Sequence, residues 1–185
     1  MKTRPMGRTS FGVTLAAALS LGPLGCGAAV RRPDGGEGLL TPTAQAPEVR
    51  GEDASGHTES LSSVRGRPAV VYFYPRDGTP GCTAEACAFR DAWERYAKLG
   101  ITVFGVSSDG AESHREFREE HHLPFPLVSD VDGSIAAAYG VPKKLWGYAR
   151  VTFLIDARGA IARVWPSVDP AVNANEVLEA AAALR

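Results

Sequence analysis

Two cysteines five residues apart are the residues of this 185-residue chain best suited to chemistry. Cys82 and Cys87 follow an apolar run at 69–74 and open an amphipathic pattern typical of a helix. Thr79 suits the N-cap and Pro80 the first helical position, which places Cys82 at the third. Unpaired N–H groups and the positive dipole end at a helix N-terminus favour a thiolate over a thiol. We therefore predict that Cys82 is a nucleophile; the alternative is a small buried cysteine packed against a sheet.

The spacing of Cys82 and Cys87 limits how they can pair. In an intact helix their Cα atoms would lie roughly 8.7 Å apart and about 140° around the axis, whereas a disulfide needs less than about 7 Å. The bond can form only if the first helical turns unwind, which favours a transient disulfide over a structural one. A zinc half-site is the other alternative, but it would need two further ligands. The histidines show no metal-ligand spacing with a second cysteine pair: His57, His114, His121 and His122.

The residues around Cys82 resemble a known active-site signature. Pro75, Thr79 and Cys82 match the Pro-x-x-x-Thr-x-x-Cys pattern of peroxiredoxins. The flanking residues, 72–77 and 79–85, are similar to those of the peroxiredoxin Q or bacterioferritin comigratory protein branch, within the wider AhpC/TSA-like peroxidases. In that branch the resolving cysteine commonly lies five residues after the peroxidatic one. The resemblance therefore gives Cys87 a role as well.

The resemblance implies an antioxidant thiol peroxidase with a redox-active centre. Cys82 would attack the O–O bond of a hydroperoxide, and Cys87 would resolve the sulfenic acid as a disulfide. Arg150, at the family's catalytic arginine position, would favour the thiolate and bind the peroxide. Thr79 would offer its hydroxyl and backbone to the same oxygens, and Pro75 would shape the pocket. No cofactor or metal is implied, and thioredoxin or a thioredoxin-like donor would recycle the enzyme. Without the resemblance, we would interpret Thr79 as a simple helix cap and Arg150 as a solvent-exposed surface charge.

The resemblance covers roughly residues 45 to 185 and implies a thioredoxin-like α/β fold, a central mixed sheet flanked by helices. The sequence pattern agrees, since strand-like runs alternate with helical ones and no internal repeat is visible. We expect a hairpin within 48–60, a helix that begins at Pro80 and is ended by Gly100, and a last helix capped by Asp169. The other expected elements are strands at 69–74, 101–106, 125–128, 151–156 and 160–165, and helices at 111–122 and 134–139.

A thioredoxin-like thiol-disulfide oxidoreductase is the main competing interpretation. Two features argue against it. Four residues separate Cys82 and Cys87, not the two of a Cys-x-x-Cys motif. Thioredoxins also carry a cis-proline before the strand facing the active site, whereas residues 149–152 contain no proline and hold Arg150 instead. A redox-inactive binding module is a third, weaker alternative.

The first residues indicate export. A basic start (Lys2, Arg4, Arg8) precedes an apolar run at 11–24, too short for an ordinary membrane span. We predict that residues 1–26 form a lipoprotein signal peptide with Cys26 as the lipid attachment site, so that the protein faces the periplasm or the outside on a membrane anchor. Pro23, three before the cysteine, departs from the lipoprotein pattern. Cleavage after Ala29, giving a soluble periplasmic protein, and an uncleaved tail stay open as alternatives.

We predict a flexible Gly/Pro-rich tether over residues 27–47 and a single domain over 48–185, large enough for one core. Loss of the three basic N-terminal residues would change the net charge from −1 to −4, which argues against nucleic-acid binding. We expect a monomer or weak dimer whose partners are a peroxide and a thioredoxin-like reductant. An exported enzyme would need that reductant outside the cytoplasm.

Overall fold

A seven-stranded mixed sheet forms the centre of the computed structural model, which describes residues 1, 29–52 and 56–184. The strands lie in the order β2-β1-β5-β4-β3-β8-β9, and a separate hairpin is made of β6 and β7. The strands are β1 (Arg50–Glu52), β2 (Thr58–Ser60), β3 (Ala69–Phe73), β4 (Thr102–Ser107), β5 (Leu127–Ser129), β6 (Lys143–Lys144), β7 (Gly147–Tyr148), β8 (Val151–Ile155) and β9 (Ile161–Trp165). The helices are η1 (Ser62–Val64), α1 (Pro80–Asp91), α2 (Trp93–Lys98), α3 (Ala111–His121), α4 (Ser134–Tyr139) and α5 (Asn173–Ala182).

The sheet combines both strand directions, as the predicted α/β class requires. β3, β4 and β5 run parallel, and β8 and β9 add an antiparallel hairpin beside β3. β1 and β2 form the hairpin expected within 48–60, and β1 pairs antiparallel with β5. The carboxyl ends of the parallel strands therefore meet at one edge, where the β3–α1 loop emerges.

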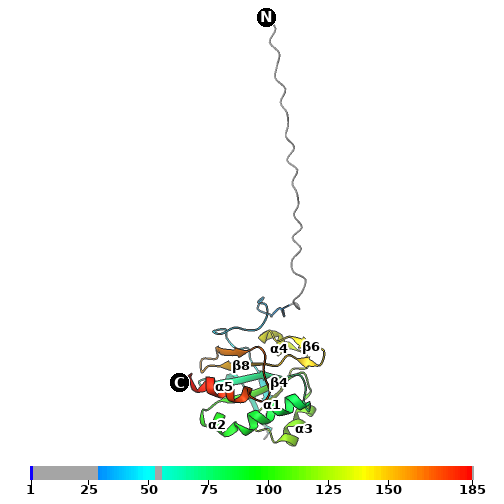
Figure 1. The fold of residues 1–185 in the computed structure, drawn as a ribbon, viewed down its shortest axis with the longest axis vertical. Helices are drawn as coiled ribbons and strands as arrows, with labels where there is room; N and C mark the ends of the chain where they lie inside the picture. The colour runs from blue at the N-terminus through cyan, green and yellow to red at the C-terminus, as the bar shows by residue number, and fades with distance from the viewer. Residues whose placement is uncertain (2–28, 53–55, 185) are drawn as a thin grey trace.

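Helices cover both faces of the sheet (Figure 1). Successive side chains of a strand point to opposite faces. Val70 and Tyr72 accordingly pack into a core with residues of α1, α2, α3 and α5. Val71 and Phe73 pack into a second core with α4 and β7. Burial of β3 on both sides explains why its sequence is a continuous apolar run.

Two helices differ from the sequence prediction. The helix expected from Pro80 to Gly100 is divided at Ala92, whose carbonyl accepts hydrogen bonds from both Arg95 and Tyr96. Phe89 before the break and Tyr96 after it are both fully buried, so packing favours the local turn.

The last helix begins at Asn173 rather than directly after Asp169. Asp169 instead closes a preceding turn, with its side chain accepting the Ala171 N–H at 3.0 Å and its carbonyl accepting the Asn173 N–H at 3.1 Å. The Asp-Pro sequence thus caps a turn that leads into α5.

The packed domain begins earlier than the predicted boundary between residues 47 and 48. The backbone N–H of Leu40 donates to Tyr139, that of Thr43 to Ile161, and Leu40 is buried in the second core. Gln45 also forms an antiparallel bridge with Ala160. The tether prediction is therefore wrong for residues 40–46, because sheet-edge hydrogen bonds use backbone groups and need no apolar composition.

The predicted signal, including Cys26, lies outside the described residues apart from Met1. Among the helices that the structure describes, none is long and apolar enough to cross a membrane.

Candidate active site

Cys82 lies where the sequence predicts, in the first turn of α1 at the carboxyl end of β3. Thr79 is the N-cap residue, with extended backbone angles (φ −80°, ψ 146°), and Pro80 is the first helical residue. The Thr79 carbonyl accepts the first helical hydrogen bond from the Thr83 N–H at 2.8 Å. Cys82 is 1% exposed, so its sulfur is almost shielded from bulk water.

The predicted side-chain cap is absent, because the Thr79 hydroxyl donates to the Arg76 carbonyl at 3.1 Å. That contact stabilises the loop before the helix. It also leaves the N–H groups of the first turn of α1 without a side-chain acceptor from Thr79. Those groups and the helix dipole are directed toward the region of Cys82 and favour a negative charge there.

Arg150 meets Cys82 through the sheet. It directly precedes β8, and β8 pairs with β3 so that Val151 lies opposite Phe73. Its Nη2 donates a hydrogen bond to the Cys82 sulfur at 3.3 Å. A guanidinium is a permanent cation at any physiological pH, so the contact stabilises a thiolate. The predicted partnership of Cys82 and Arg150 is therefore present in the geometry, across 68 residues of sequence.

Glu85 is a third member of the site that the sequence analysis did not identify. Its carboxylate is fully buried, and Oε2 accepts a hydrogen bond from Nη1 of Arg150. Desolvation raises the pKa of Glu85 to about 7, against the opposing effect of Arg150. Oε1 has no partner among the described side chains. Arg150 thus faces two groups that can be negative, and the one-turn spacing of Cys82 and Glu85 was the available sequence signal.

A cluster of buried polar side chains anchors the loop before α1 through Asp77. Asp77 accepts hydrogen bonds from the hydroxyls of Tyr74 and Ser113, each at 2.7 Å, and its Oδ2 lies 2.8 Å from Nδ1 of His114. Burial acts to raise the pKa of Asp77, but His114 and the two hydroxyls outweigh it, so the pKa lies below its ordinary value. The Asp77 N–H also donates to Asp109 at 2.9 Å. The loop is therefore fixed to β4 and α3 by buried polar contacts.

Pro75 packs against the β6–β7 hairpin. Gly147 has a φ of +124°, and a Cβ at that position would lie 1.8 Å from the Pro75 carbonyl oxygen. Only a glycine permits this approach. The hairpin therefore supports the loop that carries the predicted pocket residue Pro75 and leads to Thr79 and Cys82.

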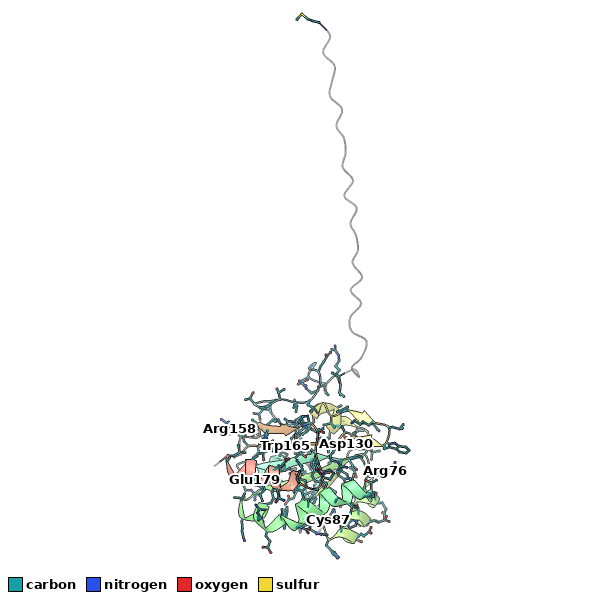
Figure 2. The ribbon with its side chains drawn as sticks, viewed as in Figure 1. Arg76, Cys87, Asp130, Arg158, Trp165 and Glu179 are labelled. Atoms are coloured by element: carbon teal, nitrogen blue, oxygen red, sulfur yellow. The ribbon has the colours of Figure 1, made fainter. Side chains whose placement is uncertain are left out.

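Cys87 lies farther along α1, which is continuous from Cys82 to Cys87. Figure 2 labels Cys87 on this helix and Arg76 on the loop before it, away from Arg158 and Glu179. Both thiols are free; Cys82 is buried and Cys87 is partly exposed. A bond between them requires the start of the helix to open, as the spacing predicts. The pairing itself stays a prediction.

Within residues 29–52 and 56–184, no group of three or more histidine, cysteine or acidic side chains is arranged to hold a metal ion. The short contacts of Cys82 are instead with Arg150 and with the surrounding core. The chemistry that this arrangement can perform is that of a shielded thiolate beside a fixed cation at a helix N-terminus.

Comparison with known proteins identifies the same family as the resemblance. The AhpC/TSA family pattern matches residues 42–164. A relative from Coxiella burnetii, named as a peroxiredoxin bcp, is 45% identical over 120 residues, covering 61% of this chain and 80% of its own.

Comparison with solved structures indicates the same family. The peroxidoxin BcpB of Mycobacterium tuberculosis superposes with a TM-score of 0.72 and 31% identity, covering 79% of this chain and 99% of its own. A peroxiredoxin Q variant from Xanthomonas campestris gives a TM-score of 0.70 and 33% identity, with coverages of 80% and 98%. These similarities confirm the thioredoxin-like fold. The chain belongs to the AhpC/TSA family, and its similarity is to the peroxiredoxin Q and bacterioferritin comigratory protein branch.

Proposed function

We propose that the chain reduces hydrogen peroxide and organic hydroperoxides with Cys82 as the peroxidatic cysteine. The observation that carries the proposal is the 3.3 Å hydrogen bond from Arg150 to the Cys82 sulfur at the start of α1. A cation and a helix N-terminus act on one buried sulfur. This is the environment that turns a cysteine into a nucleophile rather than a packing residue.

In the first step the Cys82 thiolate attacks one oxygen of the hydroperoxide and the O–O bond breaks. The sulfur becomes a sulfenic acid, and the other oxygen leaves as water or an alcohol after taking up a proton. Negative charge spreads over both oxygens in the transition state. Arg150 is already in place to stabilise it without reorganisation. Thr79 and Pro75 form the neighbouring wall, where Thr79 supplies polar groups and Pro75 helps to exclude water.

In the second step the Cys87 sulfur attacks the Cys82 sulfenic acid, forms the disulfide and releases water. The two electrons that reduce the peroxide thus come from the two thiols. A dithiol donor of the thioredoxin-like type returns both cysteines to the reduced state. Because Cys87 is partly exposed and Cys82 is buried, Cys87 is the sulfur that such a donor can reach first.

The proposal also includes export and a membrane anchor through Cys26. It is supported by the basic start, the short apolar run and the cysteine that follows it. Lipidation of Cys26 would convert its thiol into a thioether, so that Cys82 and Cys87 would be the two free thiols of the mature protein, with no third thiol to form a wrong pair. Globomycin, which blocks lipoprotein signal cleavage, should cause an unprocessed form to accumulate, and Cys26→Ser should abolish labelling by a fatty-acid probe.

The test of the chemistry is a stoichiometric oxidation. We expect the reduced protein, mixed with one equivalent of hydrogen peroxide, to give a Cys82–Cys87 disulfide by peptide mass spectrometry. Cys87→Ser should stop at a sulfenic acid on Cys82, and Cys82→Ser should not consume peroxide. Cys26→Ser is the matched control and should behave as the unaltered protein does. If peroxide leaves both thiols intact while the oxidised pair exchanges readily with substrate disulfides, the thioredoxin-like reductase interpretation replaces this one.

A further inference from the structure

The β6–β7 hairpin ends in two exposed apolar side chains. Leu145 and Trp146 expose 86% and 73% of their surface, although Tyr148 at the base of the hairpin is buried. The Tyr148 hydroxyl donates to the Asp130 carbonyl at 2.7 Å, which fixes the base. Val131, the next residue after Asp130, is also exposed, at 65%. Three large apolar side chains thus project from adjoining segments, and such a grouping marks a contact surface.

Positive charge lies beside this apolar tip. Lys143 and Lys144 form β6, are exposed, and have no ion pair within the part of the chain that the structure describes. Arg76, next to Pro75, is exposed and reaches Asp109 only at 3.9 Å. Asp132 supplies one negative charge after Val131. An aromatic and an aliphatic side chain flanked by lysines is the composition found at the interface of a bilayer with an anionic surface.

The first residues of the described N-terminal segment lie beside strand β6 of the hairpin. Ala29 and Val30 line a shallow cleft together with Pro142, Lys143 and Lys144. Figure 1 shows the first residues of the described segment at the end of the molecule that carries α4 and β6. Cys26 precedes Ala29 by three residues, a length of chain that spans at most about 11 Å. A lipid on Cys26 would therefore hold the hairpin close to the bilayer.

The peroxidatic loop adjoins this hairpin. Gly147 follows Trp146 directly and touches the backbone of Pro75, seven residues before Cys82. A surface that contacts the tip of the hairpin is consequently next to the loop that forms one wall of the proposed peroxide site. Contact with a membrane would bring oxidised lipids to that loop.

We infer that Leu145 and Trp146, with Lys143 and Lys144 beside them, dock on the surface of an anionic lipid bilayer and turn the peroxidatic loop toward it. The inference rests on the proposed function for the attachment through Cys26. It adds the orientation of the domain and the surface that presents its substrate. The occupant is a lipid surface rather than a second copy of the chain, because the lysines, the indole and the arriving N-terminal segment all lie on this side.

The test locates Trp146 relative to the acyl chains. The full-length protein is mixed with vesicles of phosphatidylcholine and phosphatidylglycerol whose acyl chains carry bromine, which quenches tryptophan on contact. The chain has three tryptophans, and Trp146→Phe isolates the contribution of Trp146. Any binding by the N-terminal segment is the same in every variant, so the readout is the position of the hairpin and not the total amount bound.

We expect quenching of the unaltered protein to be strong on vesicles with phosphatidylglycerol and to fall to the level of the two other tryptophans in Trp146→Phe. Leu145→Ser and the double variant Lys143→Glu, Lys144→Glu should each reduce the quenching of Trp146 by about tenfold, since each removes a surface or charge contact with the bilayer. The matched controls Leu184→Ser and Lys98→Glu change an exposed apolar and a basic residue elsewhere and should leave it unchanged.

Equal quenching in the unaltered protein and in Trp146→Phe would overturn the inference. A shift in Trp146 emission that depends on protein concentration in the absence of vesicles would also overturn it, because that result identifies a second copy of the chain as the occupant. Hydrogen peroxide consumption, measured on the same samples, separates the two proposals. Absence of Trp146 quenching with normal peroxide consumption refutes the membrane contact alone. Absence of peroxide consumption with normal quenching refutes the peroxidase and leaves the membrane contact standing.

Discussion

Replacement of Arg150 by methionine tests the electrostatic basis of the site directly. The arginine bridges the Cys82 sulfur, at 3.3 Å, and the buried carboxylate of Glu85. Methionine keeps much of the apolar length of the side chain and removes the cation and its donors. Cys82 then retains the helix N-terminus but loses its fixed charge partner, and Glu85 is left buried without its ion pair.

The size of the effect follows from the distance. Two unit charges 3.3 Å apart interact by about 5 kcal/mol at an effective dielectric constant near 20. Glu85 neutralises part of the same cation, so the net benefit to the thiolate and the transition state is smaller. Removal of one preorganised donor from an enzyme site costs about 3–4 kcal/mol in other systems, which corresponds to roughly 10²–10³ in rate. We therefore expect kcat/KM for hydrogen peroxide to fall by about 10²–10³.

The assay is stopped-flow oxidation of the reduced protein by hydrogen peroxide, together with the rate of alkylation of Cys82 by iodoacetamide. The double variant Glu85→Gln, Arg150→Met removes the stranded carboxylate, so it should recover the stability of the fold but not the oxidation rate. An oxidation rate of Arg150→Met within about threefold of the unaltered protein would refute the reasoning. Recovery of the rate in the double variant would also refute it, because the loss would then come from unpaired Glu85 and not from Cys82.

Three further predictions concern the surroundings of Cys82. The pKa of Glu85 is raised from 4.5 to about 7, so the folded state binds a proton at Glu85 more tightly than the unfolded state does. Protonated Glu85 therefore adds roughly 3 kcal/mol to the free energy of unfolding, and this stabilisation is lost as the pH rises from 4.5 to 7. Glu85→Gln should remove that part of the pH dependence in urea unfolding, and an unchanged difference between pH 5 and pH 8 would contradict it. Gly147→Ala should displace Pro75 and slow peroxide reduction, whereas Gly159→Ala, which also has a positive φ but whose Cβ would meet only Oε1 of Gln45 at an ordinary 3.6 Å, should lose only stability. Gly81→Ala, whose Cβ would lie 3.4 Å from Nη2 of Arg150 and 3.9 Å from Pro170, should stabilise the start of α1 by about 0.4–1 kcal/mol and slow disulfide formation after the sulfenic acid appears. Rapid-quench mass spectrometry would follow both steps, and an unchanged rate of sulfenic acid formation would show that the new methyl group has not displaced Arg150.

The parts of the site that depend on local sequence could be predicted. Thr79, Pro80 and Cys82 form a helix start whose signals all lie within four residues, and the structure places them at the N-cap, first and third helical positions as expected, although the Thr79 hydroxyl does not cap the helix. The sheet was predictable for a similar reason, because β3 and β8 are buried on both faces; β3 is an unbroken apolar run, and β8 is apolar except for Thr152. The contact of Arg150 with Cys82 spans 68 residues, and only the family resemblance pointed to it.

The parts of the site and fold that depend on tertiary contacts could not be predicted from the sequence. The spacing of Glu85 from Cys82 places the two on one side of α1, but the burial of Glu85 and its ion pair depend on β8, which brings Arg150 over it. The pairing of Asp77 with His114 depends on how α3 packs beside the loop, and no spacing in the sequence indicates it. The break at Ala92 and the edge pairing of residues 40–46 likewise follow from packing and backbone hydrogen bonds, for which composition carries no signal.

Helix α1 has to meet two opposed requirements, and the distribution of its contacts suits both. The helix must be formed at Cys82 for attack on the peroxide, since only the formed turn sets the sulfur against Arg150. It must then open for Cys82 to reach Cys87, because the intact helix keeps their Cα atoms roughly 8.7 Å apart. The firm anchors, Ala86 and Phe89, lie in its later turns and are buried in the core. The first turn contains Gly81 and lacks a side-chain cap, which lowers the free energy needed to open it by about 1–2 kcal/mol relative to a capped turn with alanine. The uncapped N–H groups thus have two effects: they favour negative charge at Cys82, and they make the first turn easier to open. The turn opens after the first step because a neutral sulfenic acid on Cys82 attracts Arg150 less strongly than the thiolate does.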